Sequence, residues 1–264
     1  MAEAVPLVGW GALLAGGLML GLWLLHLRLH NASVVDPGWA GSLALLGLLY
    51  ATFGRGYAPR AWMIGGMAAA WGFRLAFFLL LTRVAGRPEE GRYQELRRRW
   101  KTNLAWKFLF FFEFQAATCV VLSLPFLASS INPAPEIHLL EYVGLGLWTV
   151  AFVGESFADA QLERFKSNPA NRGKTCREGL WRYSRHPNYF FEWLIWVAFA
   201  TFATASPYGY MAWLCPLLML YFLFRVTGIP ATEEQALRTK GDDYRQYQET
   251  TSVFIPRLPK ERHG

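Results

Sequence analysis

The segment LVGWGALLAGGLMLGLWLL, residues 7–25, decides the class of fold because it contains no charged residue. A helix rises about 1.5 Å per residue, so roughly 20 apolar residues cross the hydrocarbon core of a bilayer. Backbone N–H and C=O groups in hydrocarbon must find their partners within the segment itself. The sequence therefore predicts a membrane-spanning helix here.

Similar apolar runs recur along the chain. They occupy residues 7–25, 39–53, 61–82, 105–128, 139–158, 189–206 and 209–227. Only 17% of the residues are charged, whereas an average soluble domain has about 25%. We therefore expect an all-α, polytopic integral membrane protein with about seven transmembrane helices. No tandem repeat or low-complexity tract is visible, so we expect a single membrane-embedded domain over residues 1–264.

Positive charge is unequally distributed between the predicted loops. Residues 83–107 carry eight Arg or Lys against three Glu, and residues 159–188 carry seven against three acidic residues. Arg and Lys concentrate on the cytoplasmic side of membrane proteins, so the N-terminus is expected outside and the C-terminus in the cytoplasm. Arg55 and Arg60 are the only two charges that depart from this rule.

Neither the net charge nor the cysteines indicate a nucleic-acid-binding surface, a disulfide framework or a metal site. The formal charge of +7 comes mostly from these loops, so it reflects topology and attraction to anionic lipid rather than nucleic-acid binding. Cys119, Cys176 and Cys215 are scattered, with no CxxC motif and no His at metal-ligand spacing. We expect neither a disulfide framework nor a metal site.

Several polar residues fall within the predicted spans, where they are costly and by default indicate function. Most lie in the cytoplasmic half of their spans, where one cavity could collect them. For each residue taken alone, an interfacial position or a helix–helix hydrogen bond is the alternative. These residues are Asp36, Arg74, Glu113, Gln115, Glu155, Asp159, Glu192 and Arg225.

The loop before the sixth run adds basic, amide and aromatic residues. It reads DAQLERFKSNPANRGKTCREGLWRYSRHPNYFFEW, residues 159–193. Such a set suits a pyrophosphate or a ribose 2′-phosphate, and Arg is favoured for bidentate contacts. The absence of a GxGxxG or Walker sequence excludes a Rossmann or P-loop cradle. A purely topogenic role of this basic loop is the alternative.

Two C-terminal motifs carry a resemblance to a known family. SRHPNYFFEW, residues 184–193, and GIPATEEQALRTKGDDYRQYQETTSVFIP, residues 228–256, resemble the C-terminal half of the steroid 5α-reductase superfamily. The similarity is closest to its bacterial branch of steroid-reductase-like membrane proteins. The segments VVDPGWAG, AWGFRLAFFLLLTR, EEGRYQELR and FEFQAATCVVLSLP fit the same branch. Residues 129–264 form the half with the more specific similarity and the expected cofactor site.

The resemblance implies a helical reductase in a bacterial inner membrane, with NADPH as its cofactor. Hydride would pass from the nicotinamide to the β-carbon of an activated C=C bond. The expected substrate is an enone in a steroid or another lipophilic molecule, and a polar side chain would polarise its carbonyl.

The resemblance also assigns cofactor residues. Asp159 matches an acid that helps hold the adenosine portion, and Lys166 stands where a basic phosphate contact is expected. Asn188 and Glu192 match residues at the nicotinamide end; they lie four apart on one helical face and could bracket the carboxamide. The full expected set is Arg74, Asp159, Arg164, Lys166, Arg172, Tyr183, Arg185, His186, Asn188, Glu192, Arg225, Glu233, Glu234 and Tyr244.

Some members of this set have a second interpretation. His186 is equally suited to a phosphate contact and to a hydrogen bond at a helix N-terminus. Glu233 and Glu234 follow Gly-Ile-Pro and suit the positive end of a helix dipole, with a ribose contact as the other role. Tyr244 and Tyr247 share a helical face and could pack over the cofactor or against the membrane surface.

Catalysis of enone reduction needs donors for the charge that builds on oxygen, and an acid that keeps its proton near pH 7. Burial can raise a carboxyl pKa enough for that role. We expect Asp36 or Glu113 as the acid, with Gln115 as a third catalytic residue. The steroid enzymes have a Gln-Glu pair and a Tyr at positions that correspond here to Val35-Asp36 and Trp71. Trp39 and Trp71 are the expected substrate contacts.

Two other functions remain as alternatives. The RHPNY core and the paired Glu are also similar to isoprenylcysteine carboxyl methyltransferases, which use S-adenosylmethionine. A non-catalytic lipid-binding protein with the same fold is the second alternative. A transporter is disfavoured because no inverted repeat is visible.

Overall fold

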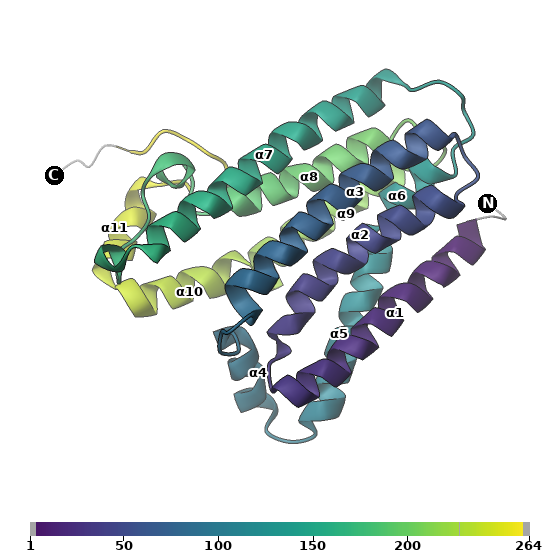
Figure 1. Cartoon of the computed structure of the whole chain (residues 1–264). Helices are drawn as coiled ribbons and strands as arrows, with labels where there is room; N and C mark the ends of the chain where they lie inside the picture. The colour runs from purple at the N-terminus through teal and green to yellow at the C-terminus, as the bar shows by residue number, and fades with distance from the viewer. Residues whose placement is uncertain (1–3, 227, 261–264) are drawn as a thin grey trace. The chain divides into compact units, whose positions relative to one another are not determined.

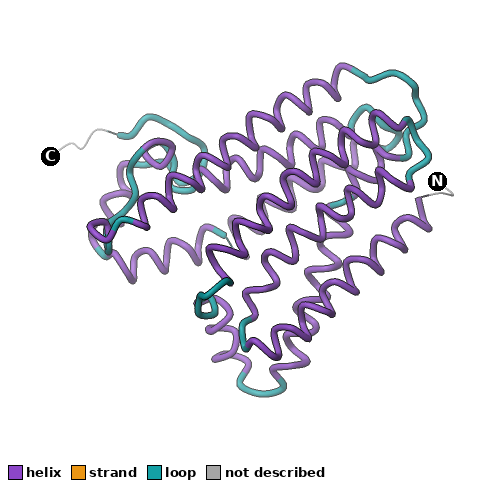
Figure 2. Tube along the Cα trace, in the orientation of Figure 1, coloured by secondary structure: helices purple, strands orange, loops and turns teal. Residues whose placement is uncertain are grey.

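The computed structural model describes residues 4–226 and 228–260, and these residues form helices and loops without a strand (Figures 1 and 2). The predicted all-α class is confirmed over this part of the chain. The α-helices are α1 (Ala4–Leu29), α2 (Val35–Phe53), α3 (Ala58–Leu79), α4 (Gly91–Trp100), α5 (Leu104–Leu122), α6 (Leu124–Ser130), α7 (Leu139–Ser167), α8 (Pro187–Ala203), α9 (Leu214–Tyr221), α10 (Ile229–Lys240) and α11 (Asp242–Thr250).

Short 3₁₀ and π segments extend or connect these helices. The 3₁₀ segments are Ala32–Val34, Pro169–Asn171, Gly179–Arg182 and Gly209–Trp213, and the π segments are Leu80–Val84 and Phe222–Val226. Five helical stretches are long and apolar enough to cross a membrane: Ala4–Leu29, Ala32–Phe53, Ala58–Val84, Leu104–Ser130 and Gly209–Lys240, the last of which spans residue 227 outside the described part of the chain. These stretches identify a multi-pass integral membrane protein.

The five stretches contain the first four predicted runs and the seventh, whose last position, residue 227, lies outside the described residues. The fifth predicted run lies in α7 and the sixth mostly in α8, which ends at Ala203, three residues before the predicted end; neither helix is among the five. α8 has only 17 residues, and the apolar run of α7 is interrupted by Glu141 and Glu155.

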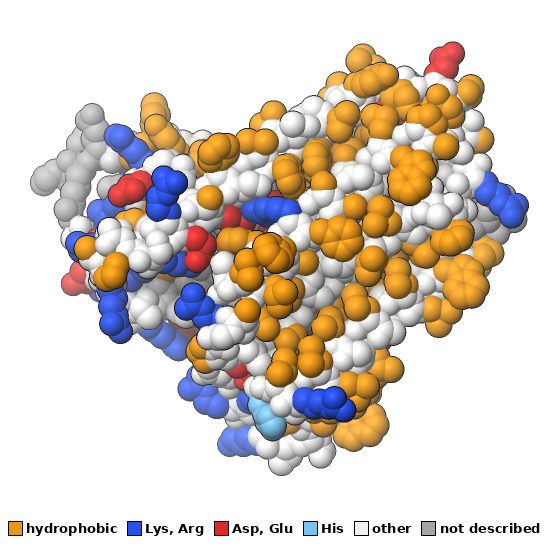
Figure 3. Space-filling view, in the orientation of Figure 1, with side chains coloured by type: hydrophobic (Ala, Val, Ile, Leu, Met, Phe, Trp, Pro, Cys, Tyr) orange, Lys and Arg blue, Asp and Glu red, His pale blue; other side chains and the backbone are white. Residues whose placement is uncertain are grey.

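The described chain forms two compact units. Unit 1 comprises residues 1–142 and 201–212, and so contains α1 to α6. Unit 2 comprises residues 143–200 and 213–264, and so contains most of α7 and α8 together with α9 to α11. Figure 3 shows hydrophobic side chains along the helix flanks, with Lys and Arg gathered around α4 in unit 1 and around α10 and α11 in unit 2.

In unit 1, α2 and α3 run side by side because small residues face each other (Figure 1). A Cβ added to Gly47 would lie 2.5 Å from Ala68 Cβ, and one added to Gly65 would lie 2.6 Å from Ala51 Cβ. Such distances leave no room for a larger residue, and close backbone approach is what small residues provide in membranes. α1 packs against α2 and α5 through a stripe spaced mainly four residues apart, which contains Leu7, Gly11, Ala15, Met19 and His26.

Arg60, which departs from the charge rule, is a buried side chain near the start of α3. Its guanidinium forms an ion pair with Glu141, and both side chains are almost completely buried, at 1% and 0% exposure. Arg60 Nη1 also donates to the carbonyls of Ala134 and Asn132, at 2.7 and 3.2 Å. The positive charge is thus neutralised within unit 1 and is not a free loop charge.

In unit 2, the C-terminal segment runs along the residues that precede α8. Arg185 N donates to Ser252 O at 2.8 Å, and Arg257 N donates to Tyr183 O at 2.9 Å. The hydroxyl of Ser184 donates to Phe254 O at 2.7 Å. The Phe254 ring then packs in a small apolar core with Leu223, Ile229, Phe190 and Trp193.

Candidate functional site

Four predicted cofactor residues of unit 2 meet around one carboxylate. Arg185 Nε donates to Glu233 Oε1 at 2.7 Å, and His186 Nε2 lies 3.2 Å from the same oxygen. The Tyr244 hydroxyl donates to Oε1 at 3.4 Å, and Gln248 Nε2 donates to Oε2 at 2.9 Å. We call Arg185, His186, Glu233, Tyr244 and Gln248 the Glu233 cluster.

The polar groups of the Glu233 cluster are directed at one another and at the backbone. Nη1 of Arg185 donates to Gln248 O at 2.9 Å and to Thr251 O at 2.7 Å. The carboxylate thereby joins the residues before α8 to α10 and α11. This arrangement stabilises the fold of unit 2, and it leaves the Arg185 guanidinium largely occupied by protein groups rather than open to a phosphate.

His186 is buried at the start of α8, where its ring contacts other protein groups. It immediately precedes α8, its backbone N–H donates to Ser184 Oγ at 3.1 Å, and its ring stacks on Tyr189 with 5.4 Å between centroids. Burial lowers the pKa of His186, although Glu233 acts in the opposite direction. The Tyr247 hydroxyl donates to Ser184 O at 3.1 Å, and burial raises the pKa of this phenol. Tyr247 therefore holds the same loop and stays protonated.

A second polar set lies where α7 and α8 face each other. Asn188 Nδ2 donates to Asp159 Oδ1 at 3.3 Å, and Asp159 is only 4% exposed. Glu192 follows Asn188 by one helical turn and is half-buried. Lys166 follows Asp159 by seven residues, which places both on one face of α7, although Lys166 is 59% exposed and pairs with Glu163 at 3.1 Å. We call Asp159, Lys166, Asn188 and Glu192 the α7–α8 polar face.

The remaining predicted cofactor residues of unit 2 are not brought to this face by any described contact. Arg164 is exposed and lies about 140° around α7 from Asp159 at 100° per residue. Glu234 is also exposed and pairs with Arg238 on the surface of α10. The other exposed members of the expected set are Arg172, Tyr183 and Arg225.

In unit 1, the two predicted substrate tryptophans and Gln115 come together. The rings of Trp39 and Trp71 meet edge to face with 6.2 Å between centroids. Trp39 Nε1 donates to Thr118 Oγ1 at 3.2 Å, and that hydroxyl donates to Gln115 O at 2.8 Å. We call Trp39, Trp71, Gln115 and Thr118 the Trp39 cluster. Its members pack directly on one another, two aromatic rings beside an amide and a hydroxyl.

Asp36 lies one helical turn before Trp39 and has partners that the sequence did not indicate. The Tyr93 hydroxyl donates to Asp36 Oδ1 at 2.5 Å, Arg92 forms an ion pair with Oδ2, and Arg83 Nη1 lies 3.7 Å from Oδ2. Both carboxylate oxygens therefore accept hydrogen bonds. Burial raises the pKa of Tyr93 well above its usual value, and the neighbouring Asp36 adds to the shift, so the phenol keeps its proton.

Glu113 lies apart from the Trp39 cluster. It is two residues before Gln115, which separates their side chains by about 200° around α5. A Cβ added to Gly16 of α1 would lie 3.3 Å from Glu113 Oε2, so this carboxyl faces α1. The third predicted span also contains Arg74, whose guanidinium lies 5.7 Å from the centre of the Phe78 ring. The three predicted catalytic residues thus occupy three different surroundings in unit 1.

Sequence reasoning missed Tyr93, Arg92, Thr118 and Gln248. Tyr93 and Arg92 belong to the EEGRYQELR segment, but nothing local shows that this segment folds back onto Asp36. Gln248 could have been found from its spacing. It lies four residues after the predicted cofactor residue Tyr244, and so on the same face of the helix. Within residues 4–226 and 228–260, no group of three or more His, Cys, Asp or Glu is arranged to hold a metal ion.

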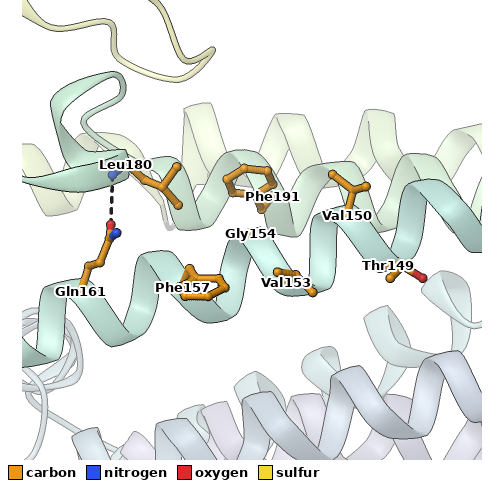
Figure 4. A pocket seen from close by; sticks show the side chains of 8 residues that line it. All are labelled: Thr149, Val150, Val153, Gly154, Phe157, Gln161, Leu180 and Phe191. Carbon is orange, nitrogen blue, oxygen red and sulfur yellow. Dashed lines mark hydrogen bonds between the residues drawn. The ribbon is translucent and has the colours of Figure 1, made fainter.

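Unit 2 also carries an open groove of 520 Å³ between α7 and α8 (Figure 4). Its walls are mostly apolar, and Gln161 near one end accepts a hydrogen bond from Leu180 N at 3.0 Å. The lining residues are Thr149, Val150, Val153, Gly154, Phe157, Gln161, Leu180 and Phe191. The groove opens on the outer surface of unit 2, since Val150 and Phe157 are exposed.

Comparison with known proteins places the chain in a family. The chain is similar to an uncharacterized protein of Schizosaccharomyces pombe, with 26% identity over 264 residues that cover 90% of this chain and 76% of that protein. No solved structure matches the chain. A family described as "Protein of unknown function (DUF1295)" matches residues 22–251. Because this match covers most of the sequence, the chain belongs to the DUF1295 family.

Proposed function

We propose that the chain is a membrane reductase of the steroid 5α-reductase superfamily that uses NADPH to reduce an activated C=C bond in a steroid-like or other lipophilic substrate. In this proposal α7 and α8 add two spans to the five apolar helical stretches. The N-terminus then lies outside, and the basic segments 83–107 and 159–188 lie in the cytoplasm, as the positive-inside rule requires. The expected location is a bacterial inner membrane.

The observation that carries the proposal is the α7–α8 polar face. The hydrogen bond between Asn188 and Asp159 sets an amide beside a carboxylate in a largely buried position, with Glu192 one turn further along α8. Buried polar groups in membrane helices are costly and indicate function by default. A nicotinamide carboxamide offers both N–H donors and a carbonyl acceptor, which this donor and acceptor set fits.

The residues of the α7–α8 polar face have separate tasks. Asn188 and Glu192 would orient the carboxamide, and Lys166 would bind a phosphate by charge. When bound, NADPH supplies the hydride of the reduction. The Glu233 cluster does not contact the cofactor in this proposal; it holds the loop before α8 and thereby sets the position of Asn188.

The expected substrate contacts Trp39 and Trp71 belong to unit 1. In this proposal their rings supply apolar contacts for a lipophilic molecule, and the buried phenol of Tyr93 keeps its proton. The single O–H of Tyr93 is donated to Asp36 Oδ1, so this phenol can polarise a carbonyl only if that hydrogen bond is exchanged for one to the substrate oxygen. Asp36 and Glu113 both stay candidates for the acid.

Replacing Asn188 or Glu192 by Ala is expected to weaken NADPH binding about tenfold each, because each change removes hydrogen bonds worth roughly 1.5 kcal/mol. Neither side chain belongs to the Glu233 cluster, but Asn188 donates to the buried Asp159, so Asn188→Ala should also lower the thermal unfolding midpoint by about 2–4 °C. The measurement is a titration of the detergent-purified protein with NADPH, followed by tryptophan fluorescence.

The matched control is Glu178→Ala, which removes an exposed carboxylate from the loop of the same unit. It should bind NADPH as the unchanged protein does. S-adenosylmethionine is titrated in parallel. If that compound binds and NADPH does not, the methyltransferase interpretation replaces the reductase; if neither binds, the protein is better explained as a non-catalytic lipid-binding protein.

A further inference from the structure

We propose that the groove between α7 and α8 holds an acyl chain of an anionic phospholipid whose phosphate is bound by Arg164 and Arg182. This lipid site is distinct from the α7–α8 polar face. It rests on α7 and α8 lying in the bilayer, which is part of the proposed seven-span arrangement, but not on the bound cofactor or on the reaction.

The groove has the chemistry and the length of an acyl-chain site. Six of its eight lining residues are apolar or Gly, and only Thr149 and Gln161 are polar (Figure 4). From Thr149 to Gln161 it follows twelve residues of α7, about 18 Å of helix. That length is close to one leaflet, half of the roughly 30 Å hydrocarbon core.

The Phe191 ring of α8 can approach α7 closely because position 154 has no side chain. A Cβ added to Gly154 would lie 2.5 Å from the Phe191 ring, so that ring lies directly against the backbone of α7. Val150 and Phe157 flank this point, and their exposed side chains form the outer rim. The depression is therefore built into the packing of α7 against α8.

Gln161 and Leu180 form one end of the groove, and each is followed along the chain by an arginine, Arg164 or Arg182. Arg164 follows Phe157 by seven residues and Gln161 by three, which places it on the same face of α7 as the groove wall. Arg182 ends the short helix Gly179–Arg182, which begins one residue before Leu180. Both are exposed, and within the described residues neither guanidinium has a hydrogen-bond or ion-pair partner.

A phosphate with an attached acyl chain satisfies both parts of this surface. Guanidinium groups bind phosphate oxygens in bidentate geometry, and basic residues at the membrane surface attract anionic lipid. A nucleotide would use the arginines but leave the apolar groove unexplained. Lys166, about 160° further around α7 from Arg164 and on the face of Asp159, remains the phosphate contact of the polar face.

The test measures binding of phosphatidylglycerol and phosphatidylcholine to the detergent-purified protein by native mass spectrometry. Phosphatidylglycerol is expected to bind about tenfold or more tightly, because two arginines contact its anionic phosphate without competition from a choline. The Arg164→Gln/Arg182→Gln variant should lose this preference. Val153→Trp, which fills the groove, should weaken binding of both lipids, and Lys174→Gln should change neither.

Three results would overturn the proposal. Equal binding of the two lipids by the unchanged protein would show that the groove has no preference for an anionic lipid. Loss of phosphatidylglycerol binding in the arginine variant but not in Val153→Trp, with displacement by excess inorganic phosphate, would leave a simple phosphate site. Loss of NADPH binding in the arginine variant would show that Arg164 contacts the cofactor, as the family resemblance implies. Failure of NADPH to bind the unchanged protein would contradict the reductase proposal alone and leave the lipid result standing.

Discussion

Replacing Glu141 by Ala is expected to lower the free energy of unfolding by about 3–5 kcal/mol. The change leaves the Arg60 guanidinium, which is 1% exposed, buried without its carboxylate partner. It also removes the acceptor of the His138 backbone N–H, which lies 2.6 Å from Glu141 Oε2. The measurement is denaturant or thermal unfolding in detergent, followed by tryptophan fluorescence.

Two comparison variants separate the ion pair from the loop that it holds. Glu136→Ala removes an exposed carboxylate but keeps the Glu136 carbonyl that accepts from Arg60 Nη2, so its effect should stay within about 0.5 kcal/mol. The Arg60→Met/Glu141→Leu double variant should recover part of the loss, because apolar residues can replace a buried pair, although the carbonyls that accept from Arg60 lose their donor. A double variant as unstable as Glu141→Ala would refute the assignment of the effect to the unpaired charge.

The second large effect is expected for Glu233→Ala, at about 3 kcal/mol. This carboxylate is 15% exposed and accepts from an arginine that is 11% exposed. Its removal also leaves the side chain of Gln248 and the phenol of Tyr244 without their hydrogen-bond acceptor. The contact that joins α10 to the loop before α8 is lost as well. The thermal unfolding midpoint should fall by roughly 10 °C, given about 2–4 °C per kcal/mol for a chain of this size.

Glu234→Ala is the matched control. The side chain of Glu234, which follows Glu233 in the sequence, is 65% exposed and forms only a surface ion pair with Arg238. Its midpoint should stay within about 2 °C of the unchanged protein. The opposite pattern would show that Glu233 serves the cofactor and not the fold: an unchanged midpoint for Glu233→Ala combined with loss of NADPH binding.

The helices could be predicted well because a long apolar run has few other stable conformations in a membrane. The end of α7 was less predictable. The fifth predicted run stopped at residue 158, where polar residues begin, but the helix continues to Ser167. Polar residues are compatible with a helix that leaves the hydrocarbon, so hydrophobicity alone does not mark its end.

The candidate site divides into parts that local spacing reveals and parts that it does not. The four-residue spacing of Asn188 and Glu192 places both on one helical face, and the same geometry separates Glu113 from Gln115. By contrast, Arg60 and Glu141 are 81 residues apart, and Tyr93 and Asp36 are 57 residues apart. Such contacts depend on how helices fold back, for which a single sequence carries no periodic signal.

The Glu233 cluster illustrates a further limit. The sequence indicated that Arg185, His186, Glu233 and Tyr244 belong near one another, but residue types alone do not decide whether polar groups bind a ligand or each other. Two buried groups of opposite charge gain most when they pair directly. Here the pairing satisfies the carboxylate with protein donors, and it shifts the expected cofactor contacts to the α7–α8 polar face.

The most direct test of the reductase proposal compares the lipids of cells that produce equal amounts of the unchanged protein or of the Asn188→Ala variant. The account predicts that the unchanged protein, and not the variant, converts one lipophilic compound into a product heavier by two hydrogen atoms. A product that gains a methyl group instead, or lipid profiles that do not differ between the two strains, would contradict it.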